Sequence, residues 1–379
     1  MGDLFVGLIS GTSMDGADAA IAQFDDDGGL STLACDTFPY PADLRARLLD
    51  AIAPGARLTL HEIGCLDIEV GRHFAHAAQS LLAQARLAPG AIAAIGSHGQ
   101  TLRHHPYPPA PYTMQIGCGA TIAALTGVTT VADFRRIDVA CGGQGAPLVP
   151  PFHAACLASP DADRVVVNIG GIANISLLQA GAKTASLGFD SGPGNCLMDE
   201  WTTRHRGAAF DADGAWAATG TVREDLLAVL LADPYFAEPV PKSTGRELFN
   251  SAFLARALAR LSTPPDAADV QATLCQLTVE TIARDIESCT AGSMSTVYVC
   301  GGGASNGELM KRLSARLAPR GVASTGTLGV DASFVEALAF AWYAKRRLDN
   351  LPTLLTTASP QRELVLGVVH LSCTQSGLL

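Results

Sequence analysis

Residues 4–24 read LFVGLISGTSMDGADAAIAQF, two apolar runs joined by a polar turn that contains glycine. The run Leu4–Ile9 is uninterrupted, which is typical of a strand buried on both faces, and Ala17–Phe24 has the character of a second strand. A turn at Asp25–Gly29 and a third strand at Thr32–Phe38 follow. This stretch predicts the order strand, glycine turn, strand, turn, strand at the start of an α/β domain.

A long helix is expected next. Thr59 and Glu62 fit a capping box, in which the two side chains satisfy each other's backbone N–H groups. Apolar residues then recur at helical spacing from Ile63 to Leu81, and Pro89–Gly90 ends the pattern. A further strand is predicted at Ala91–Ile95.

The middle of the chain repeats this order of elements. A valine-rich strand at Arg164–Ile169 is followed by Gly170–Gly171 and by a second strand at Ile172–Leu178. A turn, a third strand and helices come next, and a strand at Thr296–Cys300 precedes Gly301–Gly303. The succession of elements repeats without similarity of letters, so it predicts two α/β domains of the same kind.

The composition agrees with two folded domains. At about 100–200 residues per domain, 379 residues correspond to two. We place the first at residues 1–137, with 351–379 returning to it, and the second at 138–350. A hydrophobic content of 48% with 16% charged residues excludes a disordered chain. The formal charge of −10 does not favour a nucleic-acid partner.

The cysteines and the longest uncharged stretch bear on the compartment. Ten cysteines occur without any CxxC pair, which favours reduced structural thiols over zinc or redox motifs. The N-terminus lacks the basic region of a signal peptide. Residues 106–132 carry prolines and glycines that do not suit a membrane span. We therefore expect a cytoplasmic protein without a membrane partner.

Two common nucleotide-binding designs are absent from the sequence. There is no Gly-Lys pair for a Walker A loop and no GxGxxG for a dinucleotide fold. The first glycine turn, GTSMDGAD at residues 11–18, leads back into a strand rather than into a helix. Consecutive backbone N–H groups in such a turn can bind an anion. The alternative is a simple hairpin corner formed by Asp15–Gly16.

Two further glycine segments could carry chemistry. Asp190, in FDSGPGN, follows a buried strand that ends at Phe189 and precedes a helix that Asn195 can cap, so its carboxylate could act as a general base. The alternative is an aspartate that shapes a turn. Gly301–Gly303 precede a helix for which Ser305 and Glu308 fit a capping box, and their flat backbone could face a base or an anion.

Four charged or polar residues outside the glycine turns are candidates for substrate contacts. Arg135 and Arg136 could bind a carboxylate or phosphate through a guanidinium fork, or could be exposed at a strand end. Glu336 lies among apolar residues, where burial is costly without a partner or ligand. His98 ends a strand, where it could either contact a ligand or be a hydrogen-bonded structural histidine.

Taken together, these segments resemble the anhydro-N-acetylmuramic acid kinases of bacteria. The matching stretches run in order from Gly7 to Trp342, about nine-tenths of the chain. They are GLISGTSMDGAD, SHGQT, ADFRRIDVACGGQGAPLVPPFH, VNIGGIANIS, GFDSGPGN, PKSTGRE, CGGGASNGELM and EALAFAW. Ser191 stands where the family pattern has Thr, and residues 370–379 match no family motif. The resemblance implies two actin-like (RNase H-like) domains flanking an ATP-binding cleft.

The resemblance also implies a reaction and its participants. An enzyme of this family opens 1,6-anhydro-N-acetylmuramic acid with water and phosphorylates O6 from ATP, giving N-acetylmuramic acid 6-phosphate and ADP in cell-wall recycling. Asp190 is then the catalytic base, and Mg²⁺ accompanies ATP near Asp15 through water. A homodimer is the oligomer that the family suggests.

By the same resemblance, one set of residues binds ATP and another binds the sugar. The ATP-binding set is Gly11, Thr12, Ser13, Met14, Asp15, Gly16, Ala17, Asp18, Gly170, Gly171, Gly301, Gly302 and Gly303. The sugar-binding set is Arg135, Glu336, His98, Gly192 and Asn195. Arg135 is assigned to the lactyl carboxylate of the sugar, and Arg136 is the less suitable partner.

Two other functions stay open at this stage. The same fold could phosphorylate another sugar or sugar acid. It could also be a non-catalytic scaffold that uses bound nucleotide as a switch. Asp190 speaks against the scaffold, because a switch needs no general base.

Overall fold

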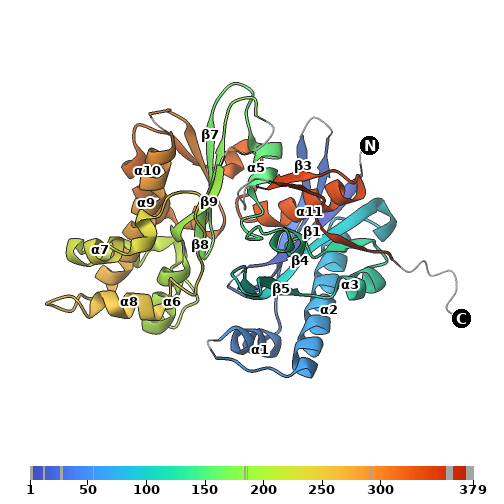
Figure 1. The fold of residues 1–379 in the computed structure, drawn as a ribbon, viewed down its shortest axis with the longest axis horizontal. Coiled ribbons are helices and arrows are strands. Elements are labelled where there is room, and N and C mark those ends of the chain that lie inside the picture. The colour runs from blue at the N-terminus through green and yellow to red at the C-terminus, as the bar shows by residue number, and fades with distance from the viewer. Residues whose placement is uncertain are drawn as a thin grey trace, which may run out of the picture. The chain divides into compact units, whose positions relative to one another are not determined.

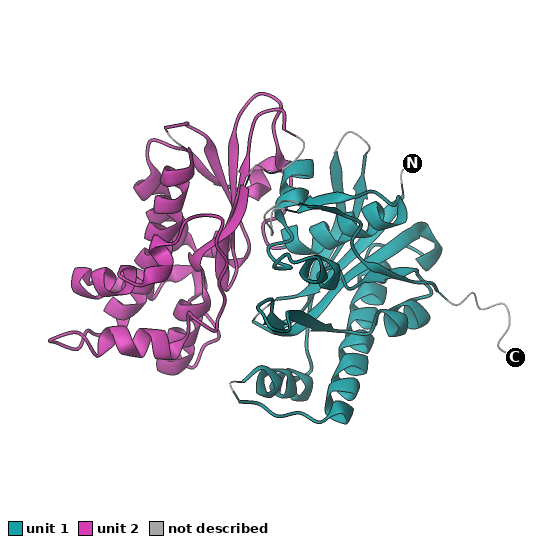
Figure 2. Cartoon of the chain, in the orientation of Figure 1, with its two compact units in different colours: residues 1–156, 334–379 teal, residues 157–333 magenta. Residues whose placement is uncertain are grey.

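The computed structural model describes residues 3–11, 13–25, 29–53, 55–182, 185, 187–290, 292–355 and 362–372. The chain divides into two compact units (Figure 2). Unit 1 consists of residues 1–156 and 334–379, and unit 2 of residues 157–333. Each unit is built around one principal sheet.

The sheet of unit 1 has the order β14-β6-β4-β1-β2-β3, and β5 pairs with β4. Figure 1 labels β1, β3, β4 and β5 of this sheet. Strands β1, β2 and β3 are antiparallel neighbours, whereas β4 runs parallel to β1 and to β6. The strands are β1 (Leu4–Ser10), β2 (Gly16–Phe24), β3 (Leu30–Pro39), β4 (Ile92–His105), β5 (Tyr112–Ile116), β6 (Thr130–Ala132) and β14 (Val368–His370). A separate pair is formed by β12 (Thr353–Leu355) and β13 (Arg362–Leu364).

Two long helices of unit 1 cover opposite faces of this sheet. Val6 and Leu8 of β1 share a core with α2, while Gly7 between them faces α11. Successive residues of a strand point to opposite faces, which explains why β1 is buried from Phe5 to Ser10. The helices of this unit are α1 (Ala42–Ile52), α2 (Leu60–Gln84), α3 (Gly119–Thr126), α4 (Arg136–Ala140), α5 (Pro150–Leu157) and α11 (Val335–Leu348).

Helix α11 approaches the sheet at two glycines. A Cβ atom on Gly7 would overlap the carbonyl oxygen of Ala337, and one on Gly96 would overlap that of Phe340. The Tyr343 hydroxyl also donates to the Leu148 carbonyl at 2.7 Å. These contacts place residues 334–350 and 138–156 in unit 1, whereas the predicted boundaries at 137 and 350 assigned both segments to the second domain.

The sheet of unit 2 repeats the pattern with the order β11-β10-β7-β8-β9. Its first three strands are again antiparallel neighbours, and β10 again runs parallel to the first strand and to the fifth. The strands are β7 (Arg164–Ile169), β8 (Ile172–Leu178), β9 (Leu187–Pro193), β10 (Thr296–Cys300) and β11 (Val322–Ser324). When β5, which lies off the main path, and the added β14 are set aside, the strands of both units follow the same order, 3-2-1-4-5. The predicted α/β class with two actin-like domains is therefore confirmed.

Helices of unit 2 bury a core against this sheet, with α9 as the longest. They are α6 (Cys196–Arg206), α7 (Glu224–Leu231), α8 (Ser251–Leu258), α9 (Ala267–Thr290) and α10 (Gly307–Leu317). Short 3₁₀ helices in the two units are Pro89–Ala91, Ala212–Gly214, Ala217–Thr219, Pro234–Ala237, Gly302–Ser305 and Thr325–Leu328.

The sequence predicted the N-terminal cap of one helix correctly and that of another incorrectly. The Thr59–Glu62 capping box of α2 is present as predicted. Helix α10 instead begins one residue later than expected, because Gly302–Ser305 forms a 3₁₀ turn and Asn306 provides the cap to the Leu309 N–H at 3.0 Å. The predicted Ser305–Glu308 capping box is therefore wrong.

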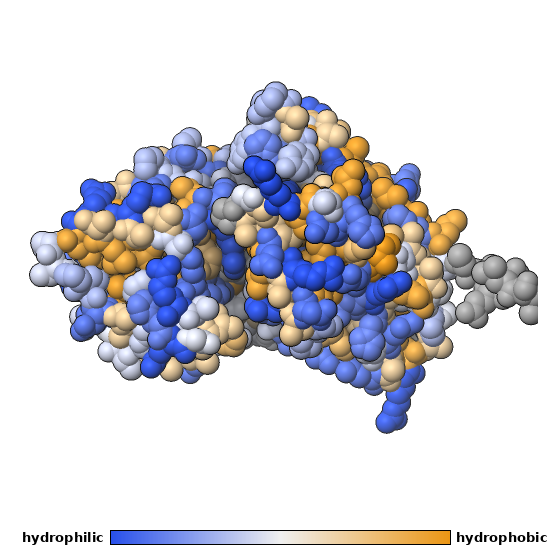
Figure 3. Space-filling model, turned by 90° about the horizontal axis from the view of Figure 1, so that it is seen from below, coloured by the Kyte–Doolittle hydropathy of each residue, from blue (hydrophilic) through white to orange (hydrophobic). Residues whose placement is uncertain are grey.

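The remaining features of the fold are its surface hydropathy, the character of its helices and the state of its cysteines. Hydrophilic and hydrophobic residues are interspersed on the face that Figure 3 shows. Within the described ranges, no helix has both the length and the apolar character needed to cross a membrane. All nine described cysteines are free thiols.

Candidate functional site

The first glycine turn of unit 1 connects β1 to β2 and is compact. The Met14 N–H donates to the Gly11 carbonyl at 3.2 Å, and Met14 holds a positive φ of 53° with its side chain buried. A Cβ on Gly16 would overlap the Phe38 carbonyl, whereas one on Gly11 would meet no atom within 4 Å. The turn therefore has open space beside Gly11, into which an anion could approach the backbone.

The remaining members of the predicted turn divide by exposure. Ser13 is exposed, and Ala17 is buried in the core of unit 1. Thr12 lies outside the described residues. Gln100, from β4, stabilises the turn through two hydrogen bonds. The buried Ser10 hydroxyl donates to the Gln100 Oε1 at 2.5 Å, and the Gln100 Nε2 donates to the Gly11 carbonyl at 3.3 Å. Gln100 belongs to the SHGQT motif, but no local pattern in the sequence predicted this role.

A second support of the turn, Arg45 of α1, was also missed. Its Nε donates to the Met14 carbonyl at 3.1 Å, and Nη2 pairs with the Asp15 carboxylate at 2.8 Å. Asp18 accepts from the Thr37 hydroxyl at 2.7 Å. Burial raises the pKa of Asp18, the Thr37 hydrogen bond lowers it, and the nearby Asp15 raises it further. A cation bound here would offset the free-energy cost of burying the charged form of the Asp18 carboxylate.

These carboxylates fit one kind of Mg²⁺ site. In the part of the chain that the structure describes, no cluster of three or more His, Cys, Asp or Glu could hold a metal ion. Mg²⁺ usually binds through one or two carboxylates together with waters and substrate phosphates. Asp15 and Asp18 supply such oxygens, so the residues suit an ion that arrives with a nucleotide.

Arg135 and His98 form a direct pair in unit 1. The Arg135 Nε donates to His98 Nε2 at 2.7 Å, so the ring proton resides on Nδ1, which donates to the Gly99 carbonyl at 2.9 Å. Burial, helped by the Arg135 charge, holds the pKa of His98 well below its usual range. The imidazole is therefore a neutral acceptor that orients the guanidinium.

The glycine loop at residues 142–145 fixes the other side of Arg135. Asp138 is fully buried, and its carboxylate accepts from the Gly145 N–H at 2.6 Å. Arg135 Nη1 donates in turn to the Gly145 carbonyl at 2.5 Å. A Cβ on Gly143 would overlap the Asp138 carboxylate, so the loop requires glycine there. The loop thus holds the guanidinium in one plane.

The other two charged candidates of unit 1 lie in different surroundings. Arg136 is exposed and pairs with Asp133 at 2.8 Å. Glu336 is in the first turn of α11 and is half-buried. The structure therefore brings together Arg135 and His98 but leaves Arg136 on the surface.

Asp190 of unit 2 lies on β9 and is 7% exposed. Its Oδ2 accepts two hydrogen bonds, from the Ser243 hydroxyl at 2.9 Å and from the Thr244 N–H at 3.1 Å. Its main-chain N–H donates to the Lys242 carbonyl at 2.9 Å, and its own carbonyl accepts from the Tyr235 hydroxyl at 2.7 Å. Asp190 is thus a nearly buried carboxylate held in one orientation.

The glycines after β7, β9 and β10 meet in unit 2. The N–H groups of Gly194 and Asn195 donate to the carbonyls of Gly171 and Gly170 at 2.9 and 2.8 Å. Asn195 occupies the N-cap position of α6 but does not cap it, contrary to the prediction, because its Nδ2 donates to the Ile169 carbonyl at 3.1 Å. Gly192 precedes this group on β9.

Gly301–Gly303 join the same group. Gly301 has a positive φ of 78°, and a Cβ there would overlap the Asn168 side chain. A Cβ on Gly302 would lie 3.6 Å from the Asn195 Nδ2. The turn thus packs against the end of β7 and beside Asn195. The structure therefore assembles the predicted residues of unit 2 at one end of its sheet.

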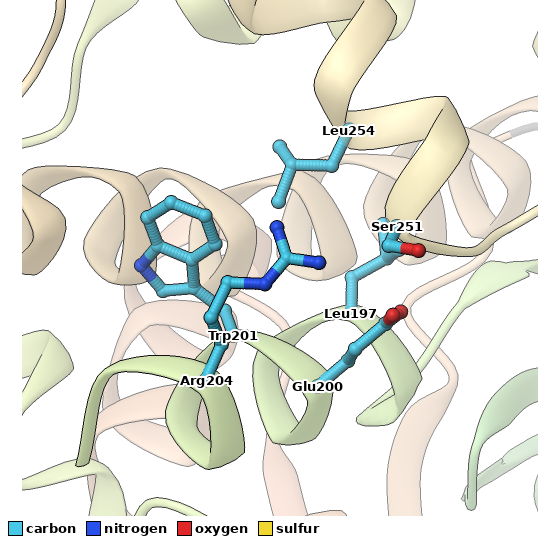
Figure 4. Close-up of a pocket in the computed structure, with 6 residues that line it drawn as sticks. All are labelled: Leu197, Glu200, Trp201, Arg204, Ser251 and Leu254. Atoms are coloured by element: carbon cyan, nitrogen blue, oxygen red, sulfur yellow. The ribbon is translucent and has the colours of Figure 1, made fainter.

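The cavity in Figure 4 is a different feature. It lies in unit 2 between α6 and α8 and has a volume of about 10 Å³, too small for a nucleotide or a sugar. Its lining consists of Leu197, Glu200, Trp201, Arg204, Ser251 and Leu254. No predicted site residue is among them.

The fold and comparisons with known proteins show the class and the family to which the chain belongs. Two units with the same strand order, each with a glycine turn after its first strand, define a two-domain α/β protein of the actin-like class. The family model described as anhydro-N-acetylmuramic acid kinase matches residues 3–372. The chain therefore belongs to the anhydro-N-acetylmuramic acid kinase family, and it is an enzyme of that family.

Individual relatives agree with the family model. A protein of that name from Vibrio cholerae is 47% identical over 369 residues, covering 97% of this chain and 98% of the relative. One from Saccharophagus degradans is 46% identical over 372 residues, covering 97% and 98%. Among solved structures, the activator of the 2-hydroxyisocaproyl-CoA dehydratase from Clostridium difficile with bound ADPNP is similar with a TM-score of 0.48 and 11% identity, covering 92% of this chain and 98% of that chain.

Proposed function

We propose that the chain uses ATP and water to convert 1,6-anhydro-N-acetylmuramic acid into N-acetylmuramic acid 6-phosphate and ADP, a step of cell-wall recycling. Full-length relatives at 46–47% identity are named for this kinase activity. The observation that carries the mechanism is Asp190, whose carboxylate is nearly buried and held by Ser243 and Thr244. A fixed carboxylate of this kind is suited to general-base catalysis.

The 1,6-anhydro bridge of the substrate dictates the order of bond changes. Because O6 is bonded to C1, the sugar has no free 6-hydroxyl to phosphorylate. Asp190 takes a proton from water as the water oxygen bonds to C1 and the C1–O6 bond breaks. O6 then bonds to the γ-phosphorus of ATP, and the bond from that phosphorus to the β-phosphate oxygen breaks to give ADP.

Backbone groups in both units are proposed to bind ATP. The Gly11–Asp18 turn and Gly170–Gly171 are assigned to the phosphates, and Gly301–Gly303 to the adenosine. Open space beside Gly11 and the absence of side chains at the glycines support this assignment, because the backbone can approach a phosphate closely. Mg²⁺, when bound with ATP, neutralises charge on the phosphates. Asp15 and Asp18 are the residues that would hold it, Asp15 through water.

The sugar is assigned to residues of both units. Arg135 binds the lactyl carboxylate, since a guanidinium fork matches a carboxylate and His98 and Gly145 already fix its plane. His98 thus serves the sugar through Arg135. Glu336, Gly192 and Asn195 complete the proposed sugar-binding set.

Replacing Asp190 with Asn tests this function. The amide cannot accept the proton from water, so turnover should fall by about 10²–10⁴-fold. The assay follows ADP release with and without the anhydro-sugar. Near-normal turnover of the variant would remove Asp190 from its role, and ADP release independent of the sugar would favour the nucleotide-switch alternative.

We also propose that the enzyme is a homodimer in the cytoplasm. Free thiols at all nine described cysteines suit a reducing compartment, where ATP is available. Sedimentation equilibrium of the full chain measures the oligomer directly. A single species with the mass of one chain would exclude the dimer.

A further inference from the structure

Asp190 is held by a segment that begins 50 positions further along the chain, Val240–Thr244. On one side of β9, Asn174 of β8 pairs with Asp190 in the sheet register. On the other side, the Lys242 carbonyl accepts from the Asp190 N–H at 2.9 Å. Because β9 is at the end of the described strand order, the 240–244 segment follows the edge of the sheet at this residue.

The same segment also contacts the carboxylate. The Ser243 hydroxyl and the Thr244 N–H both donate to Oδ2, at 2.9 and 3.1 Å. Two donors on one oxygen restrict rotation of the carboxylate. They also favour its ionised form, since hydrogen bonds to a carboxylate stabilise the charge. An ionised and oriented carboxylate is what a general base requires.

Lys242 anchors the segment to the interior of unit 2. Its side chain is only 3% exposed, and its Nζ lies 3.4 Å from Oδ1 of Asp285 on α9. The ammonium also lies 4.9 Å from the ring centroid of Tyr235, whose hydroxyl donates to the Asp190 carbonyl. Burial raises the pKa of Asp285, and the Lys242 charge lowers it. A buried ion pair of this kind fixes geometry, because neither charge can separate from the other cheaply.

We propose that the 240–244 segment is a positioning device for the general base and that Ser243 is its principal positioning residue. The inference rests on the proposed function, in which Asp190 accepts a proton from water. Ser243 donates to the Asp190 carboxylate and acts on the reaction through it. Ser243 belongs to the PKSTGRE motif, so this role accounts for the motif's place beside the general base.

The test compares Ser243→Ala and Ser243→Thr with the wild-type enzyme over a range of pH. Loss of the hydroxyl should lower kcat about tenfold and move the acid limb of its pH profile about one pH unit upward, since the carboxylate holds its proton more tightly. KM for ATP and for the anhydro-sugar should stay within about twofold. Ser243→Thr keeps the hydroxyl and should restore most of kcat. Ser314→Ala, on the exposed face of α10, is the matched control and should behave as wild type.

The outcomes separate this inference from the function on which it rests. If wild-type enzyme does not turn over the anhydro-sugar, the proposed function fails and the inference fails with it. If wild type is active but Ser243→Ala keeps the wild-type kcat and acid limb, only the positioning role is overturned. A lower unfolding temperature with an unchanged acid limb would likewise assign Ser243 to structure alone.

Discussion

Replacing Arg135 probes the sugar-binding half of unit 1. The guanidinium donates to His98 Nε2 at 2.7 Å and to the Gly145 carbonyl at 2.5 Å. These bonds hold the planar group in one orientation, in which it can bind a carboxylate. Each hydrogen bond between charged partners contributes about 1.5–3 kcal/mol. Arg135→Ala should therefore raise KM for the anhydro-sugar about 100-fold, while KM for ATP changes by about twofold or less.

Two companion variants sharpen the Arg135 experiment. Arg135→Lys keeps the charge but loses the fork, so about a tenfold rise in KM for the sugar is expected. Arg136→Ala is the matched control, because its side chain is 70% exposed and its pair with Asp133 is a surface ion pair of small energy. Initial rates are measured against each substrate in turn. An equal rise of both KM values in Arg135→Ala would refute the assignment of Arg135 to the sugar carboxylate.

Three further predictions concern stability. Gly7→Ala should lower the free energy of unfolding by at least about 1–3 kcal/mol, because the new methyl group displaces α11 from the sheet. Urea unfolding measures this loss, and an unchanged midpoint would contradict the packing. Lys242→Met should cost about 3–5 kcal/mol, since it leaves Asp285 buried without its cation, and Lys242→Met with Asp285→Asn should recover part of that loss. Burial lowers the pKa of His153 to about 3. The unfolded chain therefore binds a proton below about pH 6.5 that the native state does not, so stability falls with decreasing pH by up to about 1.4 kcal/mol per pH unit from this residue. His153→Gln should flatten that slope between about pH 6.5 and pH 4, and an equal slope in both proteins would refute the burial argument.

Strands were the most predictable part of this fold. Arg164–Ile169, Ile172–Leu178 and Thr296–Cys300 have the bounds that the sequence predicted, because short apolar runs between turns define buried strands. Strand β4 extends to His105 rather than ending at Ile95. The second half of β4 carries polar residues and is stabilised by pairing with β5. No local pattern in the sequence predicts this pairing.

The domain to which α11 belongs was harder to predict. Its apolar composition indicates burial but does not say against which sheet. The complementary signals are Gly7 and Gly96, more than 200 residues earlier, where the absence of a side chain admits the helix backbone. Only the three-dimensional structure pairs a helix with glycines so far away in sequence.

The site shows the same division between local and distant signals. Asp190 and Arg135 were found because each lies within a distinctive motif. Asp190 was predicted to follow a strand that ends at Phe189, but β9 continues to Pro193 and includes it, whereas Arg135 does follow β6. The partners of the two residues were not found, since Ser243 lies 53 positions from Asp190 and His98 lies 37 from Arg135. Hydrogen bonds over such separations leave no periodicity in the sequence.

The most direct test of the account is a single turnover assay in water enriched in ¹⁸O, with the anhydro-sugar, ATP and Mg²⁺. Mass spectrometry then locates the label in the phosphorylated sugar. Attack of water at C1 predicts one ¹⁸O at C1, phosphate at O6 and one ADP for each sugar consumed. Phosphorylated product without label at C1, or ADP formed without a labelled sugar, would contradict the hydrolytic mechanism.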